Sequence, residues 1–80
     1  MKIRAGKERG TPFVSVVVAA RNEADNIRAC LCRLLHQDYP EECYEVIVVD
    51  DGSSDGTPEI ALSIGEGRKG FRLLSVEEEG

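Results

Sequence analysis

The chain has 80 residues, with 10 Lys and Arg against 15 Asp and Glu, which gives a net charge of -5. An acidic balance of this kind disfavours nonspecific binding to nucleic-acid phosphates, so we expect no nucleic-acid partner. The length suits one small domain or part of a larger one, and no stretch approaches the ~20 consecutive apolar residues that cross a bilayer. We therefore expect a soluble, cytoplasmic segment, and we leave open that a full-length protein reaches the cytoplasmic face of the membrane through other regions.

Residues 1–10 are locally basic, because they include Lys2, Arg4, Lys7 and Arg9. They lack the apolar core of a secretory signal, and a short charged terminus is typically solvated. We predict a poorly ordered basic tail over residues 1–10, followed by a domain over residues 11–80. Contact of this tail with anionic lipid is the alternative.

Two apolar runs end in polar clusters. Residues 13–20 lead into Arg21, Asn22 and Glu23, and residues 46–49 lead into the cluster of residues 50–57. Continuous apolar runs are typical of strands buried in a parallel sheet, where ligands lie beyond the carboxyl ends of the strands. Both clusters are therefore expected at one ligand crevice.

Helical signals follow each strand. Asn22 is a candidate N-cap, with Glu23 and Asp25 in the first helical turn. Apolar side chains then recur at helical spacing, at Ile27, Cys30, Leu31, Leu34 and Leu35.

Thr57 and Pro58 suit the start of a second helix, which we expect to stop at Gly65, and residues 71–76 suit a third strand. Alternation of strands and helices predicts an α/β fold: a partial Rossmann-like, three-layer half-domain of three parallel strands and two helices.

Three motifs in this order carry a family resemblance: Asn22-Glu23, Gln37-Asp38-Tyr39-Pro40, and the run of residues 49–57, Val-Asp-Asp-Gly-Ser-Ser-Asp-Gly-Thr. Over roughly residues 14–62, the chain resembles the amino-terminal, nucleotide-binding portion of family 2 glycosyltransferases with the GT-A fold. The resemblance implies the strand order 3-2-1. It also implies an inverting transfer of sugar from a nucleoside diphosphate sugar, with UDP the expected nucleotide, to an acceptor hydroxyl. The product, whether a polysaccharide, a glycolipid or a modified lipid carrier, stays open.

The resemblance also assigns residues. Asp50 is expected to accept the N3–H of the base, while Asp51 holds the loop or reaches toward the ribose. Glu23 is expected near the ribose or base, or as a residue of the first helical turn, and Ala20 is small enough to let a ring approach. Arg21 replaces an aromatic residue common in the family, and it can stack on a base or neutralise a diphosphate. Loop-structural roles are expected for Asn22, Gly52, Ser53, Asp55, Gly56 and Thr57.

The family's later Asp-x-Asp motif, which holds a divalent metal, and its catalytic carboxylate have no counterpart at matching positions here. We therefore expect no catalytic or metal-binding residues within this chain, a Mg or Mn requirement in the full-length enzyme, and no transfer activity for the segment alone. The resemblance makes the strand at residues 13–20 central in a complete enzyme. In an isolated segment we expect that strand to be an open edge that favours self-association or domain exchange.

Two other classes of function are considered. An acidic pair at a strand end can build a magnesium site for phosphoryl transfer, as in receiver or phosphatase-like domains, although the accompanying motifs differ. A nonenzymatic interaction module on the same scaffold is the other alternative. Cys30, Cys32 and Cys43 are odd in number and His36 is the lone histidine, so we expect reduced structural thiols rather than a zinc site.

Overall fold

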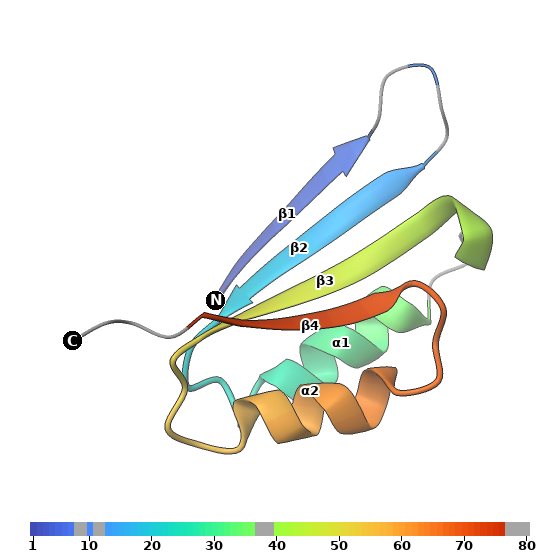
Figure 1. Ribbon diagram of the computed structural model, residues 1–80. Helices are drawn as coiled ribbons and strands as arrows, with labels where there is room; N and C mark the ends of the chain where they lie inside the picture. Colours follow the sequence, from blue (N-terminus) through green and yellow to red (C-terminus); the bar gives the residue numbers. More distant parts are fainter. Residues whose placement is uncertain (8–9, 11–12, 37–39, 77–80) are drawn as a thin grey trace.

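The computed structural model describes residues 1–7, 10, 13–36 and 40–76, so residues 37–39 of the Gln-x-Tyr-Pro motif lie outside it. In chain order the elements are β1 (Lys2–Lys7), β2 (Val14–Ala20), α1 (Ile27–Leu35), the 3-10 helix η1 (Glu41–Cys43), β3 (Tyr44–Asp51), α2 (Thr57–Gly65) and β4 (Phe71–Val76). One sheet joins the strands in the order β1-β2-β3-β4 (Figure 1). β2, β3 and β4 run parallel, while β1 is antiparallel to β2.

The three parallel strands confirm the expected α/β class and the expected strand order. In β3, side chains alternate between buried and half-buried, because successive residues of a strand point to opposite faces of the sheet. Val46 and Val48 are fully buried beside Val18 of β2, and they form the centre of the core.

The apolar stripe of α1 is confirmed, with Ile27, Leu31 and Leu35 buried and with Cys30 and Leu34 packed against the core. The start of this helix differs from expectation. Asn22 is not its N-cap, because α1 begins at Ile27 after Asn26, and no acidic residue lies in its first turn. Asn22 instead has a φ of 51°, a left-handed conformation that breaks the chain direction after β2.

The prediction of a poorly ordered amino-terminal tail is wrong for Lys2–Lys7, which form β1. Its six residues pair with β2 from Lys2 opposite Ala19 to Lys7 opposite Val14. Every residue of β1 is exposed, so backbone pairing rather than burial holds the strand. The expected open edge at residues 13–20 is therefore wrong as well, and the case for domain exchange at that edge loses its basis.

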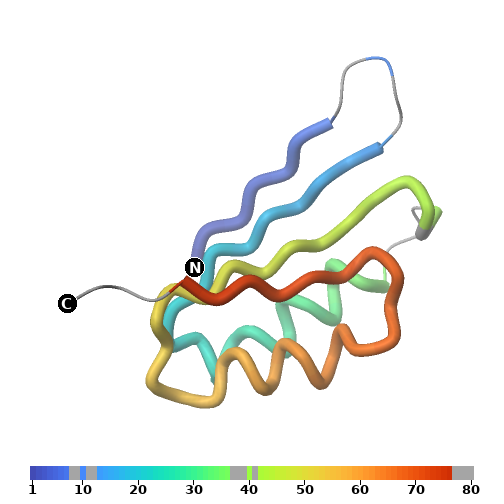
Figure 2. The backbone as a smooth tube through the Cα atoms, in the orientation of Figure 1, coloured from blue at the N-terminus to red at the C-terminus, as the bar shows by residue number. Residues whose placement is uncertain are grey.

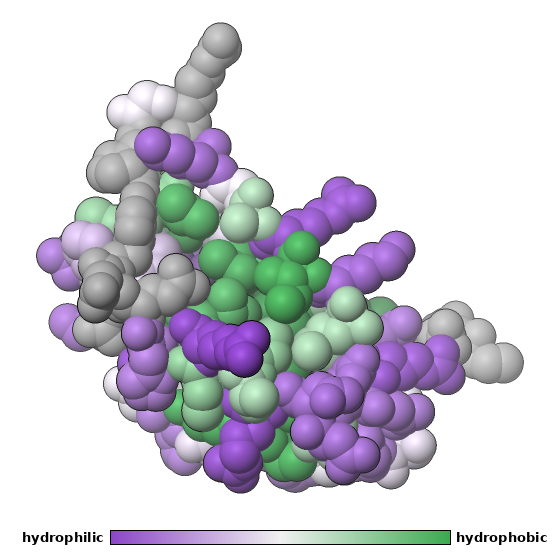
Figure 3. Space-filling view, turned by 180° about the vertical axis from the view of Figure 1, so that it is seen from behind, coloured by the Kyte–Doolittle hydropathy of each residue, from purple (hydrophilic) through white to green (hydrophobic). Residues whose placement is uncertain are grey.

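The expected three-layer arrangement is wrong for the described part of the chain, which has two layers: one sheet and one layer of helices (Figure 1). Both helices lie on the same face of the sheet (Figure 1), as successive right-handed crossovers in one direction require. The opposite face carries exposed apolar side chains at Val17, Leu74 and Val76. Seen from behind, hydrophobic side chains reach the surface among hydrophilic ones (Figure 3).

Because β1 is antiparallel, the start of the chain lies beside the end of β2 (Figure 2). None of the helices among the described residues has the length and apolar character needed to span a membrane. The three cysteines are free thiols, and burial raises the pKa of the Cys30 thiol above its usual range.

Candidate functional site

Two loops meet at the carboxyl ends of β2 and β3, as the sequence predicts. The first loop follows Ala20 and leads into α1, and the second follows Asp51 and leads into α2. β2 and β3 are in register from Val14 opposite Tyr44 to Ala20 opposite Asp50, so both strands end at the same height. The polar clusters of the sequence therefore lie side by side at one edge of the sheet.

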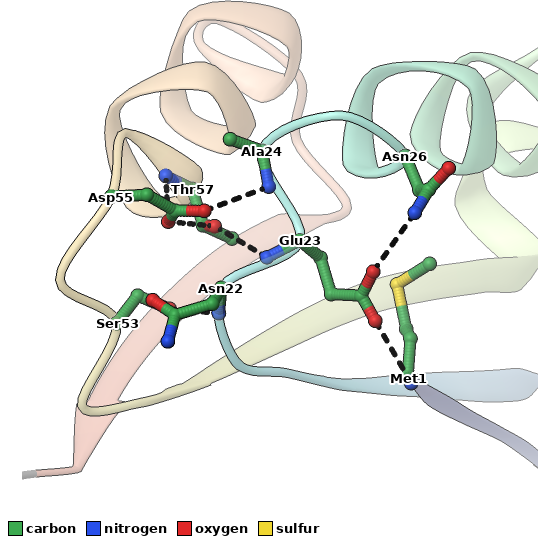
Figure 4. A network of polar contacts seen from close by, with 8 residues as sticks. All are labelled: Met1, Asn22, Glu23, Ala24, Asn26, Ser53, Asp55 and Thr57. Carbon is green, nitrogen blue, oxygen red and sulfur yellow. Dashed lines mark hydrogen bonds and ion pairs between the residues drawn. The ribbon is translucent and has the colours of Figure 1, made fainter.

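Three consecutive backbone N–H groups of the first loop donate to side chains of the second (Figure 4). Asn22 N donates to Ser53 Oγ at 2.9 Å, Glu23 N to Thr57 Oγ1 at 2.8 Å, and Ala24 N to Asp55 Oδ2 at 3.1 Å. In return, Ser54 N donates to Asn22 Oδ1 at 2.8 Å. We call these four contacts the cross-loop latch.

Thr57 and Asp55 each make several contacts in and around the latch. Thr57 is fully buried, and its hydroxyl donates to Asp55 while it accepts from Glu23. Asp55 also accepts from Thr57 N at 3.0 Å, which closes the turn before α2. Gly52 has a φ of +65°, a conformation that glycine adopts without strain, and Gly56 is the residue before α2.

Neighbouring donors lower the pKa of two carboxylates at this edge. The pKa of Glu23 lies below its ordinary value of 4.5, because the Asn26 side chain donates to it at 3.1 Å and the amino group of Met1 lies 3.0 Å away. The pKa of Asp55 is likewise lowered, chiefly by the Thr57 hydroxyl. Glu23 lies before α1, and its carboxylate is bound by Asn26 and by the Met1 amino group.

The side chains of the adjacent Asp50 and Asp51 point to opposite faces of the sheet. Asp50 follows Val46 and Val48 on the helix-covered face, where it is 5% exposed and accepts from Ser53 N at 3.4 Å and from the Ser53 hydroxyl. It is thus Asp50 that holds the loop, a role that the sequence-based interpretation gave to Asp51. Asp51 is half-buried and points to the opposite face of the sheet.

Asp51 lines an open pocket at the carboxyl edge, of about 220 Å³. The other lining residues are Met1, Lys2, Ala19, Ala20 and Arg21. Of the five residues predicted to contact nucleotide, the structure places Ala20, Arg21 and Asp51 around this pocket, whereas Asp50 and Glu23 are not part of its wall. Complete small-molecule pockets are typically ~300–1,000 Å³, so this one would hold part of such a ligand.

Sequence reasoning missed Met1 and Lys2, which β1 brings to the pocket. The available signal was the alternation of charged and apolar residues in Lys2-Ile3-Arg4-Ala5, which has the period of a strand. In the described part of the chain, no three His, Cys, Asp or Glu side chains converge as a metal site.

The parallel strands, the crossover helices and the pocket at the carboxyl edge define an α/β protein of the Rossmann-like class. Residues 15–80 match the model of the family described as glycosyl transferase family 2. The chain belongs to this family, and the resemblance to family 2 glycosyltransferases is confirmed.

Curated relatives agree with this assignment. The chain is 46% identical over 68 residues to glycosyltransferase AglE of Haloferax volcanii, which covers 85% of this chain and 22% of that protein. It is 44% identical over 63 residues to a beta-monoglucosyldiacylglycerol synthase of Trichormus variabilis, covering 79% of this chain and 14% of the relative. The chain thus spans about a fifth or less of the length of these relatives.

A solved structure supports the GT-A fold. The mannosyltransferase PcManGT from Pyrobaculum calidifontis, in complex with GDP-Man and Mn²⁺, superposes with a TM-score of 0.67 at 40% sequence identity. The match covers 81% of this chain and 19% of that one.

Proposed function

We propose that this chain forms the nucleotide-sugar-binding portion of an inverting glycosyltransferase, which transfers sugar from a nucleoside diphosphate sugar to an acceptor hydroxyl. The observation that carries the proposal is the pocket at the carboxyl edge, where Ala20, Arg21 and Asp51 converge within the family match. The mannosyltransferase PcManGT, to which the chain is 40% identical, is in complex with the nucleotide sugar GDP-Man.

Each pocket residue has a chemical role in this proposal. The carboxylate of Asp51 accepts the ring N–H of the base, and the small Ala19, exposed on the same face of the sheet, lets the ring approach the backbone beside Ala20. Arg21 is exposed at the pocket and supplies positive charge for the diphosphate. We choose UDP as the nucleotide on the resemblance to family 2 glycosyltransferases, and GDP is the alternative that PcManGT raises.

The structure favours this proposal over the acidic-pair magnesium site. Asp50 and Asp51 point to opposite faces of the sheet, and the carboxylate of Asp50 is engaged by Ser53. The pair therefore does not converge on one cation. PcManGT contains Mn²⁺, and a Mg²⁺ or Mn²⁺ ion in a longer enzyme of this kind would need ligands from outside the described residues.

In this proposal the described residues bind the donor and take no part in the bond-making step. In an in-line displacement at the anomeric carbon, the acceptor oxygen attacks while the nucleoside diphosphate leaves, and a carboxylate takes the acceptor proton. We propose that the described residues orient the donor for this step, that the acceptor base lies elsewhere in a complete enzyme, and that the 80-residue chain alone has no transfer activity.

Titration of the ¹⁵N-labelled chain with UDP, for wild type and for Asp51→Asn, tests the proposal. We expect the substitution to weaken UDP binding by about 1–2 kcal/mol, because the ring N–H exchanges a charged carboxylate acceptor for a weaker, neutral amide oxygen. Asp25→Asn is the matched control, since it removes the same charge from an exposed turn beside α1 and should leave the affinity unchanged.

The outcomes separate the parts of the proposal. Equal affinities for wild type and Asp51→Asn would remove Asp51 from its role, and tighter binding of GDP than of UDP would reject the choice of base. A wild-type chain that binds neither nucleotide would contradict the proposed function itself.

A further inference from the structure

β1 brings a cation to the pocket from outside the family match. The matched region begins at residue 15, whereas β1 ends at Lys7. Because β1 is antiparallel to β2, its first residues lie at the carboxyl end of β2, and Lys2 pairs with Ala19. The amino-terminal end of β1 therefore lies beside the carboxyl end of β2 (Figure 2).

The charge of the pocket differs from that of the whole chain. Lys2 and Arg21 stand at its wall against the single carboxylate of Asp51, so the lining side chains carry a net positive charge in a chain whose net charge is -5. Among the described residues the ion pairs are those of the Met1 amino group with Glu23 and of Arg72 with Glu45, so neither Lys2 nor Arg21 is neutralised by a described carboxylate. Two unneutralised cations beside one pocket favour an anionic ligand.

The two cations approach from different strands. Lys2 lies on β1, and Arg21 directly follows the last residue of β2, so the wall between them is formed by Ala19 and Ala20. Ala19 is exposed on the same face as Lys2, and its short side chain leaves the space between the two cations open, while the Ala20 side chain is buried on the helix-covered face. An extended Lys ammonium and a planar guanidinium can then contact different oxygens of one anion.

We propose that Lys2 is an additional nucleotide-binding residue, which together with Arg21 binds the diphosphate of the donor. This inference rests on the proposed function, and it assigns β1 a role in ligand binding rather than in stabilising the sheet alone. In this arrangement Asp51 binds the base end of the nucleotide, and the two cations bind its anionic end.

Titration of the full 80-residue chain with UDP and with uridine tests the assignment through Lys2→Gln. We expect UDP to bind about threefold to fivefold more weakly at low salt, the upper part of the range for an exposed ion pair, whereas uridine, which has no phosphate, binds as to wild type. The difference should shrink as salt is added, because the contact is exposed.

Arg4→Gln is the matched control. Arg4 lies on the same face of the same strand, two residues farther from the pocket, and the substitution removes one charge as well. We expect it to change the UDP affinity less than twofold. Unchanged amide shifts of β1 in both variants verify that the strand is retained.

Two results would overturn the inference: equal UDP affinity for Lys2→Gln and wild type, or equal losses for Lys2→Gln and Arg4→Gln, which would indicate a general charge effect. Either leaves the proposed function standing, since wild type still binds UDP and still depends on Asp51. Failure of the wild-type chain to bind UDP at all would instead overturn the proposed function, and with it this inference.

Discussion

Thr57 illustrates how single residues shape this site. Its side chain is fully buried, and its hydroxyl accepts from the backbone of Glu23 while it donates to Asp55. A buried N–H without an acceptor costs free energy comparable to a lost hydrogen bond. One hydroxyl thus fixes the first loop of the site against the start of α2.

Thr57→Val should lower the free energy of unfolding by about 1–3 kcal/mol, because the nearly isosteric side chain leaves Glu23 N without its acceptor and removes one of the donors to Asp55. Urea unfolding followed by circular dichroism measures the change. Thr57→Ser is the control, since it keeps the hydroxyl and should retain the larger part of the stability lost in Thr57→Val. A Val variant as stable as wild type would show that the hydrogen bonds of the Thr57 hydroxyl contribute nothing to stability.

For single residues, the sequence predicts which of them lie together at the site. It does not predict to which face of the sheet every side chain points. Asn22, Asp55 and Thr57 were expected in structural roles, and their side chains form hydrogen bonds between the two loops. The burial of Asp50, which was expected at the base, was not anticipated, although Val46 and Val48 already predict that Asp50 shares their buried face. The hydrogen bond from Ser53, which makes that burial tolerable, depends on the folded loop and leaves no pattern in the sequence.

Among the elements, β1 changes the expected picture most. α1, α2 and the parallel strands were predictable because apolar periodicity, Pro58 and Gly65 mark them locally. β1 has no buried residue, so its stability depends on pairing with a distant strand edge, which the local sequence does not reveal. Charged side chains such as Lys2 and Arg4 also protect an exposed edge from further pairing.

Removal of residues 1–12 should expose the edge of β2 and cause concentration-dependent self-association, because an apolar strand then presents unpaired backbone groups. Sedimentation velocity at several concentrations measures it. Adding Val17→Lys to the shortened chain is the control, since Val17 is 36% exposed and a charge at that edge should restore the monomer. A shortened chain that stays monomeric without this substitution would contradict a protective role for β1.

For the molecule as a whole, the direction of the strands places the proposed nucleotide site at one end of the sheet. The opposite end has a second depression, lined in part by Glu42, Glu45, Lys69 and Arg72, where Arg72 and Glu45 form an ion pair at 3.1 Å. Its charged residues neutralise one another, whereas the lining of the carboxyl-edge pocket has excess positive charge. We therefore expect an anionic nucleotide to bind at the carboxyl-edge pocket and not at the opposite depression.

Mapping of backbone amide shifts during UDP addition to the ¹⁵N-labelled chain tests this placement most directly. The account predicts that the largest changes fall at the carboxyl edge, on Ala20, Arg21 and Gly52, while Glu45 and Arg72 at the opposite end stay unchanged. Changes centred on Glu45 and Arg72, with the carboxyl edge silent, would contradict it.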